Sequence, residues 1–240
     1  MRLEKIKAGR FVCFAPIAHG GFVGKPLRLC LSRLSRWRLK NIGCLLSILL
    51  LASCGKDVLA PKEYANYIRN EKNGLQVSKT IDGFEFSLLY KPVEYIALMQ
   101  DKDENISKSV LDEKTKPMQG MQYYTFTIKT ESGQELMREG ISAENEYYER
   151  LDYIVSYMQN DISLIDGKDT LPCALFHYER NYNIAPQNNF VLGFEIPKAE
   201  ENTVTDKTLV FNDQILGIGK LMLTINSNAI KNIPQLKLSK

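Results

Sequence analysis

Few residues in this chain could supply nucleophilic or acid–base chemistry. Of the two histidines in the 240-residue sequence, only His177 lies beyond residue 53. A Ser–His–Asp triad would need it, yet no Gly-x-Ser-x-Gly sequence occurs. Cys173 lies among apolar neighbours, which predicts a buried thiol with a raised pKa. We therefore expect a half-exposed strand histidine at 177, and neither a Cys–His pair nor a histidine-based zinc site.

Carboxylate and amide oxygens in one polar stretch have the spacing of a calcium loop. Asp101, Asp103, Asn105 and Asp112 fall at positions 1, 3, 5 and 12 of an EF-hand pattern. The stretch departs from that pattern, since Ile106 replaces the glycine of the sharp turn and Asp112 is shorter than the usual glutamate. Lys108 also occupies the usual apolar position. The sequence thus offers a weak metal site, and it favours the simpler alternative of a solvated polar loop.

Two other groups of side chains are candidates for function. Glu144, Glu146 and Glu149 could do acid–base work, but their spacing fits the solvent face of an amphipathic helix. All 12 tyrosines follow residue 53, and tyrosine suits both binding surfaces and the margins of a small core. Core positions are favoured for most of them. The candidate binding stretch is Tyr178, Arg180 and Tyr182, where aromatic and polar side chains alternate beside a loop.

The segment before residue 56 has the features of a secretory signal. A basic stretch at 36–40 precedes 15 uncharged residues, 41–55, which are too few for a spanning helix of ~20 residues. The stretch ends in Leu51, Ala52, Ser53 and Cys54, followed by Gly55. This sequence resembles the lipobox of bacterial lipoproteins at all four positions. The resemblance covers about residues 36–55 and does not extend to the rest of the chain.

The resemblance implies a processing route and a membrane location. Signal peptidase II would cleave between Ser53 and Cys54, and Cys54 would become the lipidated N-terminus that binds the membrane. In Gram-negative lipoproteins the residue after that cysteine governs sorting, and Gly55 implies the outer membrane. The 35 residues before the signal are unusual for the family. We interpret 1–35 as an over-extended or unstructured leader, 36–53 as the signal peptide and 54–60 as a lipidated tether.

Charge divides the chain at the same place. Residues 1–53 hold ten basic residues and one acidic residue, whereas residues 54–240 hold 21 basic and 27 acidic residues. The predicted mature chain therefore carries a net charge of −6, which argues against a nucleic-acid groove. Phosphate-binding glycine motifs are absent from the sequence, because Gly217-Ile218-Gly219-Lys220 is too short a match. We expect no cofactor and no nucleic-acid partner.

Residues 61–240 read as one α+β domain with a mainly antiparallel sheet. Alternating apolar residues on both sides of Asp82-Gly83 predict a hairpin with a type I′ turn. Further strands are expected at 122–130, 161–165, 170–180, 190–196, 208–212 and 220–226. Residues 101–120 are expected to form a loop with a helical turn. Short helices are predicted after Pro61 and Pro92.

A long amphipathic helix is predicted at about 143–159. Tyr147, Leu151, Ile154 and Met158 recur at helical spacing, with Tyr148 and Val155 beside them. Ser142 could cap this helix, and Glu146–Arg150 could form an i,i+4 pair.

Three functions fit these observations. The first is a lipid-anchored, non-catalytic binding or accessory lipoprotein of the cell envelope, with an envelope protein or a glycan as partner. The second is an envelope hydrolase that uses carboxylates, which a cleft with two facing carboxylates would favour. The third is a structural lipoprotein that holds an envelope assembly together. An exposed apolar or tyrosine-rich patch would favour the first or the third.

Overall fold

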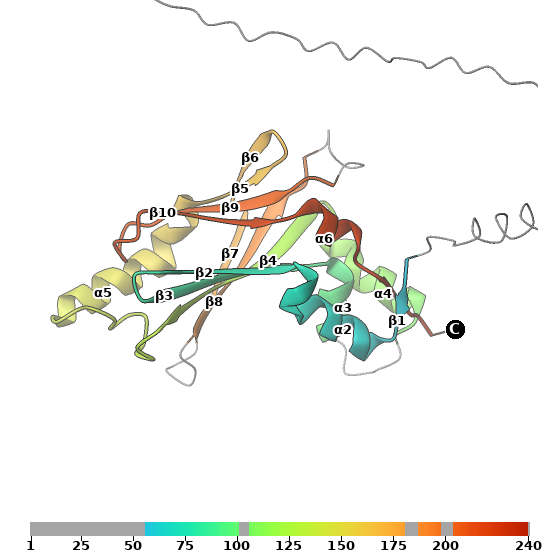
Figure 1. Ribbon diagram of the computed structural model, residues 1–240, viewed down its shortest axis with the longest axis horizontal. Coiled ribbons are helices and arrows are strands. Elements are labelled where there is room, and N and C mark those ends of the chain that lie inside the picture. Colours follow the sequence, from blue (N-terminus) through green and yellow to red (C-terminus); the bar gives the residue numbers. More distant parts are fainter. Residues whose placement is uncertain (1–55, 101–105, 181–186, 198–203, 240) are drawn as a thin grey trace, which may run out of the picture. The chain divides into compact units, whose positions relative to one another are not determined.

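A five-stranded antiparallel sheet forms the larger layer of the protein (Figure 1). The computed structural model describes residues 56–100, 106–180, 187–197 and 204–239. The strand order is β2–β3–β4–β8–β7, with β2 (Gln76–Ile81), β3 (Phe84–Lys91), β4 (Met121–Thr130), β8 (Gln187–Glu195) and β7 (Leu175–Glu179). Buried and half-buried residues alternate along β4, so one face of the sheet packs on a core.

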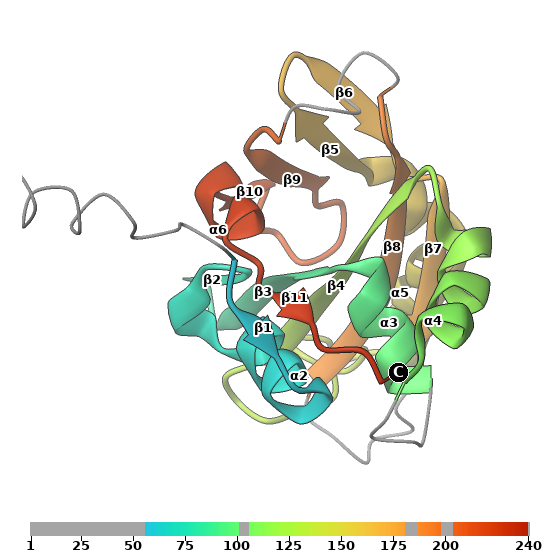
Figure 2. The ribbon, with the colours of Figure 1, turned by 90° about the vertical axis from the view of Figure 1, so that its right-hand side faces the viewer.

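A four-stranded antiparallel sheet packs against that face (Figure 2). Its order is β10–β9–β5–β6, with β10 (Lys220–Ile225), β9 (Lys207–Asn212), β5 (Ile162–Asp166) and β6 (Asp169–Pro172). The rings of Phe126 on β4 and Phe211 on β9 meet edge to face, with centroids 5.8 Å apart. Aromatic and aliphatic side chains from both sheets therefore form one continuous core.

The strand expected at 170–180 is in fact two strands in different sheets. β6 ends at Pro172 and β7 begins at Leu175, so the chain changes sheet at Cys173 and Ala174. The Ala174 N–H donates a hydrogen bond to the carbonyl of Gly193 on β8 at 2.9 Å. The apolar run from Leu171 to Phe176 continues through the bend, because the chain enters the second sheet almost directly. Periodicity alone cannot reveal such a corner.

Three short helices gather at one end of this domain. They are α2 (Pro61–Arg69), α3 (Val93–Gln100) and α4 (Lys108–Thr115), and their buried side chains form a second core around Ile68, Tyr95 and Leu111. Pro61 occupies the first turn of α2 and Glu63 lies at its positive end, as predicted. The short strand β1 (Val58–Leu59) pairs in parallel with β11 (Gln235–Leu236), just after the last helix, α6 (Ser227–Lys231).

The polar stretch before β4 is more helical than the sequence indicates. We expect a loop with one helical turn at 101–120, but α4 covers eight residues and a 3-10 helix, Lys116–Met118, follows it. The Ser107 hydroxyl caps α4 by accepting a hydrogen bond from the Val110 N–H. Leu111 is buried, so tertiary packing stabilises a helix whose local hydrophobic pattern is weak.

The long amphipathic α-helix expected at 143–159 is not a single α-helix. The α-helical part, α5 (Glu144–Asp152), continues as a π-helical turn, Tyr153–Tyr157, and a 3-10 turn, Met158–Asp161. We call the whole run 144–161 the α5 segment. Ala143, and not Ser142, is the N-cap, and it makes no side-chain cap hydrogen bond. The predicted packing face is correct, because Ile154 and Met158 are buried in the first core.

Arg150 has a different role from the one its spacing predicts. Instead of an ion pair with Glu146, its guanidinium donates hydrogen bonds to the carbonyls of Leu136 and Glu139, at 2.8 and 2.6 Å. The carboxylate of Glu146 accepts a hydrogen bond from the Ser142 N–H at 3.1 Å. Both contacts fasten the start of the α5 segment to the residues before it.

The predicted hairpin turn is confirmed. Ile81 and Phe84 are paired, and the two residues between them, Asp82 and Gly83, both have positive φ angles, of 47° and 82°. This is the type I′ geometry that Asp-Gly favours. The fold as a whole is mixed α and β with mostly antiparallel sheets. Among the described helices, none combines the length and the apolar character needed to cross a membrane.

Candidate functional site

The predicted calcium loop is only partly within the described residues. Asp101, Asp103 and Asn105 lie outside them, whereas Asp112 lies on α4. Its carboxylate pairs with Lys108 Nζ at 2.8 Å, and both side chains are well exposed. The fourth ligand position is thus a helical residue with a partner of its own. No three His, Cys, Asp or Glu side chains in the described ranges are placed to hold a metal ion.

The candidate binding stretch at 178–182 is not assembled as a site within the described residues. Tyr178 is half-buried on β7, its ring stacks on Phe190 at 5.2 Å, and its hydroxyl donates to Asn188 Oδ1 at 2.9 Å. It therefore belongs to the margin of the core, which is the alternative that the sequence left open. Arg180 is exposed just after β7, and Tyr182 lies outside the described ranges. The lipobox residues Leu51, Ala52, Ser53, Cys54 and Gly55 also lie outside them.

His177 and Cys173 lie in or close to the environments that the sequence predicts. His177 is on β7, an edge strand, and it is more exposed than the half-exposed position that we expect. Cys173 is buried, and its thiol donates to the carbonyl of Leu175 at 3.1 Å. Burial raises the pKa of Cys173 to about 11. The thiol is therefore a poor nucleophile near neutral pH.

A buried polar cluster joins the two sheets, and sequence reasoning missed it. Asp166, on β5, is fully buried and accepts hydrogen bonds from the side chains of Lys207, Thr205 and Gln122. Gln122 is on β4 in the other sheet, and its Oε1 accepts a hydrogen bond from the Tyr124 hydroxyl at 2.9 Å. The only local signal was Asp166-Gly167, which indicates a turn. Nothing in the sequence shows that this carboxylate is buried.

Electrostatics keep Asp166 charged. Burial by itself would raise the pKa of its carboxyl group, but the hydrogen bonds from Lys207, Thr205 and Gln122 outweigh burial and hold the pKa below its usual value. Lys207 is also almost buried, and its ammonium donates a second hydrogen bond to the Thr205 hydroxyl at 3.1 Å. The groups satisfy one another within the core, so the cluster acts as a link between the sheets.

The α5 segment carries the most exposed aromatic side chains of the described residues. Tyr148, Val155 and Tyr157 are 59%, 59% and 56% exposed. We call Tyr148 and Val155, with the neighbouring carboxylates of Glu144, Glu149 and Asp152, the α5 face; Tyr157 is left out because residues two apart in a helical run do not share a face. The sequence placed Tyr148 and Val155 beside the packing face. In the structure they point away from the core, and Val155 lies within the π-helical turn.

The charge of the predicted mature chain is concentrated in the same region. Residues 131–161 contain eight carboxylates against two arginines, a net charge of −6, which equals the net charge of the whole of 54–240. Both arginines have internal partners. Arg138 lies over the Tyr147 ring at 4.6 Å and within 4 Å of carboxylates on Glu135 and Glu144. Arg150 is held by backbone carbonyls.

Two of the pockets in the described residues bear on the carboxylate hydrolase that the sequence leaves open. One, of about 310 Å³, lies beside the end of the α5 segment and is lined by neutral polar side chains including Gln159, Asn160, Ser163 and Thr170. The other, of about 330 Å³, lies at the β1 end of the domain between Tyr64, Glu94, Leu111 and β11. Neither pocket brings two carboxylates face to face, which is the arrangement that would favour a carboxylate hydrolase.

Comparisons with known proteins do not identify a family for this chain. No family model matches the chain, and no curated protein matches it. A solved structure, described as a novel protein of unknown function from Burkholderia pseudomallei, is similar with 14% sequence identity and a TM-score of 0.33. The match covers 73% of this chain and 94% of that one. Such a similarity establishes neither a shared fold nor a function.

Proposed function

We propose that this protein is a lipid-anchored, non-catalytic accessory lipoprotein of the bacterial envelope that presents a binding surface close to a membrane. The lipobox resemblance at Leu51–Cys54 supplies the anchor. The observation that carries the proposal is the short distance in sequence between Cys54 and the first paired residue of the domain, Val58. This body could not act far from its membrane.

The start of the domain is fastened on both sides of β1. The Gln235 N–H donates to the carbonyl of Asp57, and the Lys237 N–H donates to the carbonyl of Leu59, both at 2.8 Å. Counted from the predicted lipidated cysteine, four residues, 54–57, precede β1. Four extended residues reach about 14 Å, so the β1 end of the domain would lie against the lipid headgroups.

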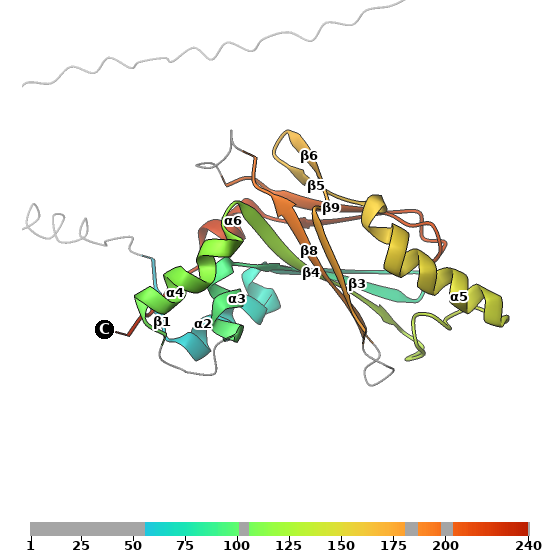
Figure 3. The same ribbon diagram turned by 180° about the vertical axis from the view of Figure 1, so that it is seen from behind.

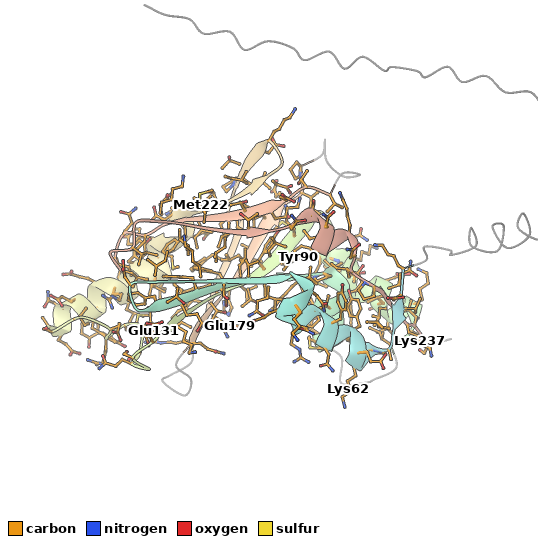
Figure 4. All side chains as sticks on the ribbon, in the orientation of Figure 1. Lys62, Tyr90, Glu131, Glu179, Met222 and Lys237 are labelled. Carbon is orange, nitrogen blue, oxygen red and sulfur yellow. The ribbon has the colours of Figure 1, made fainter. Side chains whose placement is uncertain are left out.

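The anchoring end and the α5 segment lie at opposite ends of the domain. Figures 1 and 3 place β1, α2 and β11 at one end and α5 at the other. Lys62 and Lys237 are at the β1 end, whereas Glu131 lies toward α5 (Figure 4). In the proposed arrangement the basic side chains face the headgroups and the acidic α5 face points away from the membrane. By the resemblance of Gly55, that membrane is the outer one where the source has two.

Lipid labelling of the full chain tests the anchor. Cys54→Ser should abolish incorporation of a palmitate analogue and block cleavage before residue 54, because the thiol that takes the lipid is gone. Cys173→Ser is the matched control, and it should label and mature normally because that thiol is buried. Normal labelling of Cys54→Ser, or a mature protein that retains Trp37 and its fluorescence, would refute the proposal. Density fractionation of the membranes then decides which membrane holds the protein.

A further inference from the structure

We infer that the α5 face is a docking surface for a basic, apolar segment of another envelope protein. The inference rests on the proposed function, which places the partner in the envelope. The structure supplies the argument for the partner's chemistry. Helix-in-groove and helix-on-helix recognition use aromatic and aliphatic anchors spaced along one face. Tyr148 and Val155 are seven residues apart in the α5 segment, and both are exposed.

The aromatic anchor at one end of this face is held in place before any partner arrives. The Tyr148 ring meets the Tyr147 ring edge to face at 5.3 Å. Tyr147 is in turn covered by the Arg138 guanidinium and packs against the first core. Rigid, partly exposed tyrosines lose little conformational entropy on binding, which is why they dominate many interfaces.

The backbone beneath the face is also fixed. Ile154 and Met158, on the opposite side of the α5 segment, are buried with Leu136 and Met137 from the preceding loop. Arg150 ties that loop to the segment through two carbonyls. Between these contacts lies the π-helical turn 153–157, a type of distortion that often occurs at functional sites and that here carries both Val155 and Tyr157.

Charge then decides the kind of partner. Arg138 lies within 4 Å of Glu144, so the exposed carboxylates of Glu149 and Asp152 give the α5 face its negative charge. An anionic lipid surface would be repelled. A second copy of the chain that used the same face would bring like charges together. A segment with lysines or arginines around apolar side chains is complementary to the apolar side chains of the α5 face and to its carboxylates.

Binding of a model peptide to the soluble domain tests this inference. Residues 55–240 form one compact unit that contains both cores, so this domain can be purified without its anchor. The probe is a fluorescein-labelled amphipathic peptide of about 20 residues with leucine on one face and lysine on the other. Its matched control has glutamate in place of lysine. Fluorescence anisotropy gives the affinity, and circular dichroism confirms that each variant is folded.

Substitutions on the α5 face should weaken binding, and a substitution elsewhere should not. The lysine peptide binds, and Tyr148→Ser with Val155→Ser weakens binding at least about tenfold, whereas Tyr148→Phe changes it less than about threefold. Glu149→Gln with Asp152→Asn also weakens it, and added salt does the same. Met222→Ser, which alters an exposed apolar residue of the four-stranded sheet, leaves binding unchanged (Figure 4).

Four results would overturn the inference. They are no binding, equal binding of the glutamate peptide, sensitivity to charge but not to Tyr148 and Val155, and self-association of the domain through this face. The soluble domain, residues 55–240, lacks Cys54. Normal lipid labelling of Cys54→Ser, which would refute the anchor, would therefore leave the peptide result standing, and failure of peptide binding would leave the anchor standing.

Discussion

Asp166 and Lys207 are opposite residues in the β5–β9 ladder, and the Lys207 ammonium donates a hydrogen bond to Asp166 Oδ1. Their side chains are only 1% and 11% exposed. A buried pair of this kind is stable only while both partners are present, because either charge alone would be buried without compensation. The cluster around them, which reaches Gln122 in the other sheet, makes the contact between the two sheets sensitive to single substitutions.

Removing the cation tests that dependence. Lys207→Met should lower the free energy of unfolding by about 3–5 kcal/mol, because Asp166 stays buried without its ion-pair partner. Asp112→Asn, which breaks the exposed Lys108–Asp112 pair, should cost less than about 1 kcal/mol. Urea denaturation of the soluble domain measures both. Equal effects of the two substitutions would contradict a structural role for the buried cluster.

The same pair predicts how stability depends on pH. The pKa of Asp166 is lower in the folded protein than the value of about 3.9 expected when the chain is unfolded. Its contribution is therefore present above about pH 4 and is lost as the pH falls through the folded pKa. The unfolding free energy of the parent domain should fall more steeply below about pH 4 than that of Asp166→Asn, which has no carboxyl group to titrate. Parallel curves would show that another carboxylate is responsible.

Cys173 should be unreactive in the folded protein. It is buried, and a pKa of about 11 leaves a thiolate fraction at pH 8 roughly 100-fold below that of a free cysteine. Reaction with a disulfide reagent at pH 8 should be slow in buffer and rapid in urea. Rapid reaction without denaturant would mean that the bend between β6 and β7 opens readily.

The turn between β2 and β3 should tolerate asparagine but not alanine. Gly83 has a φ of 82°, and a Cβ added there would meet no other atom within 4 Å. Gly83→Ala should therefore cost about 1–2 kcal/mol through backbone strain alone. Gly83→Asn should cost much less, because asparagine adopts positive φ more readily. Thermal melts of the two variants make the comparison, and identical melts would argue against the type I′ turn.

The sequence by itself determined the features that depend on neighbouring residues. The Asp82-Gly83 hairpin, the helix start at Pro61, the packing face through Ile154 and Met158 and the buried Cys173 all follow from turn chemistry or periodicity, which are local. The lipobox at Leu51–Cys54 is equally local, and the lipid anchor that it implies stays a prediction.

Tertiary structure alone decided the rest. Asp166 has the local signature of an exposed turn, and it is buried because Lys207 and Gln122 reach it from 41 and 44 residues away. The corner at Cys173 divides one apolar run between two sheets. The α5 segment leaves Tyr148 and Val155 in solvent although its spacing placed them beside the core. Each outcome depends on contacts between segments that are far apart in the sequence. Such contacts leave no trace in the local pattern of residues.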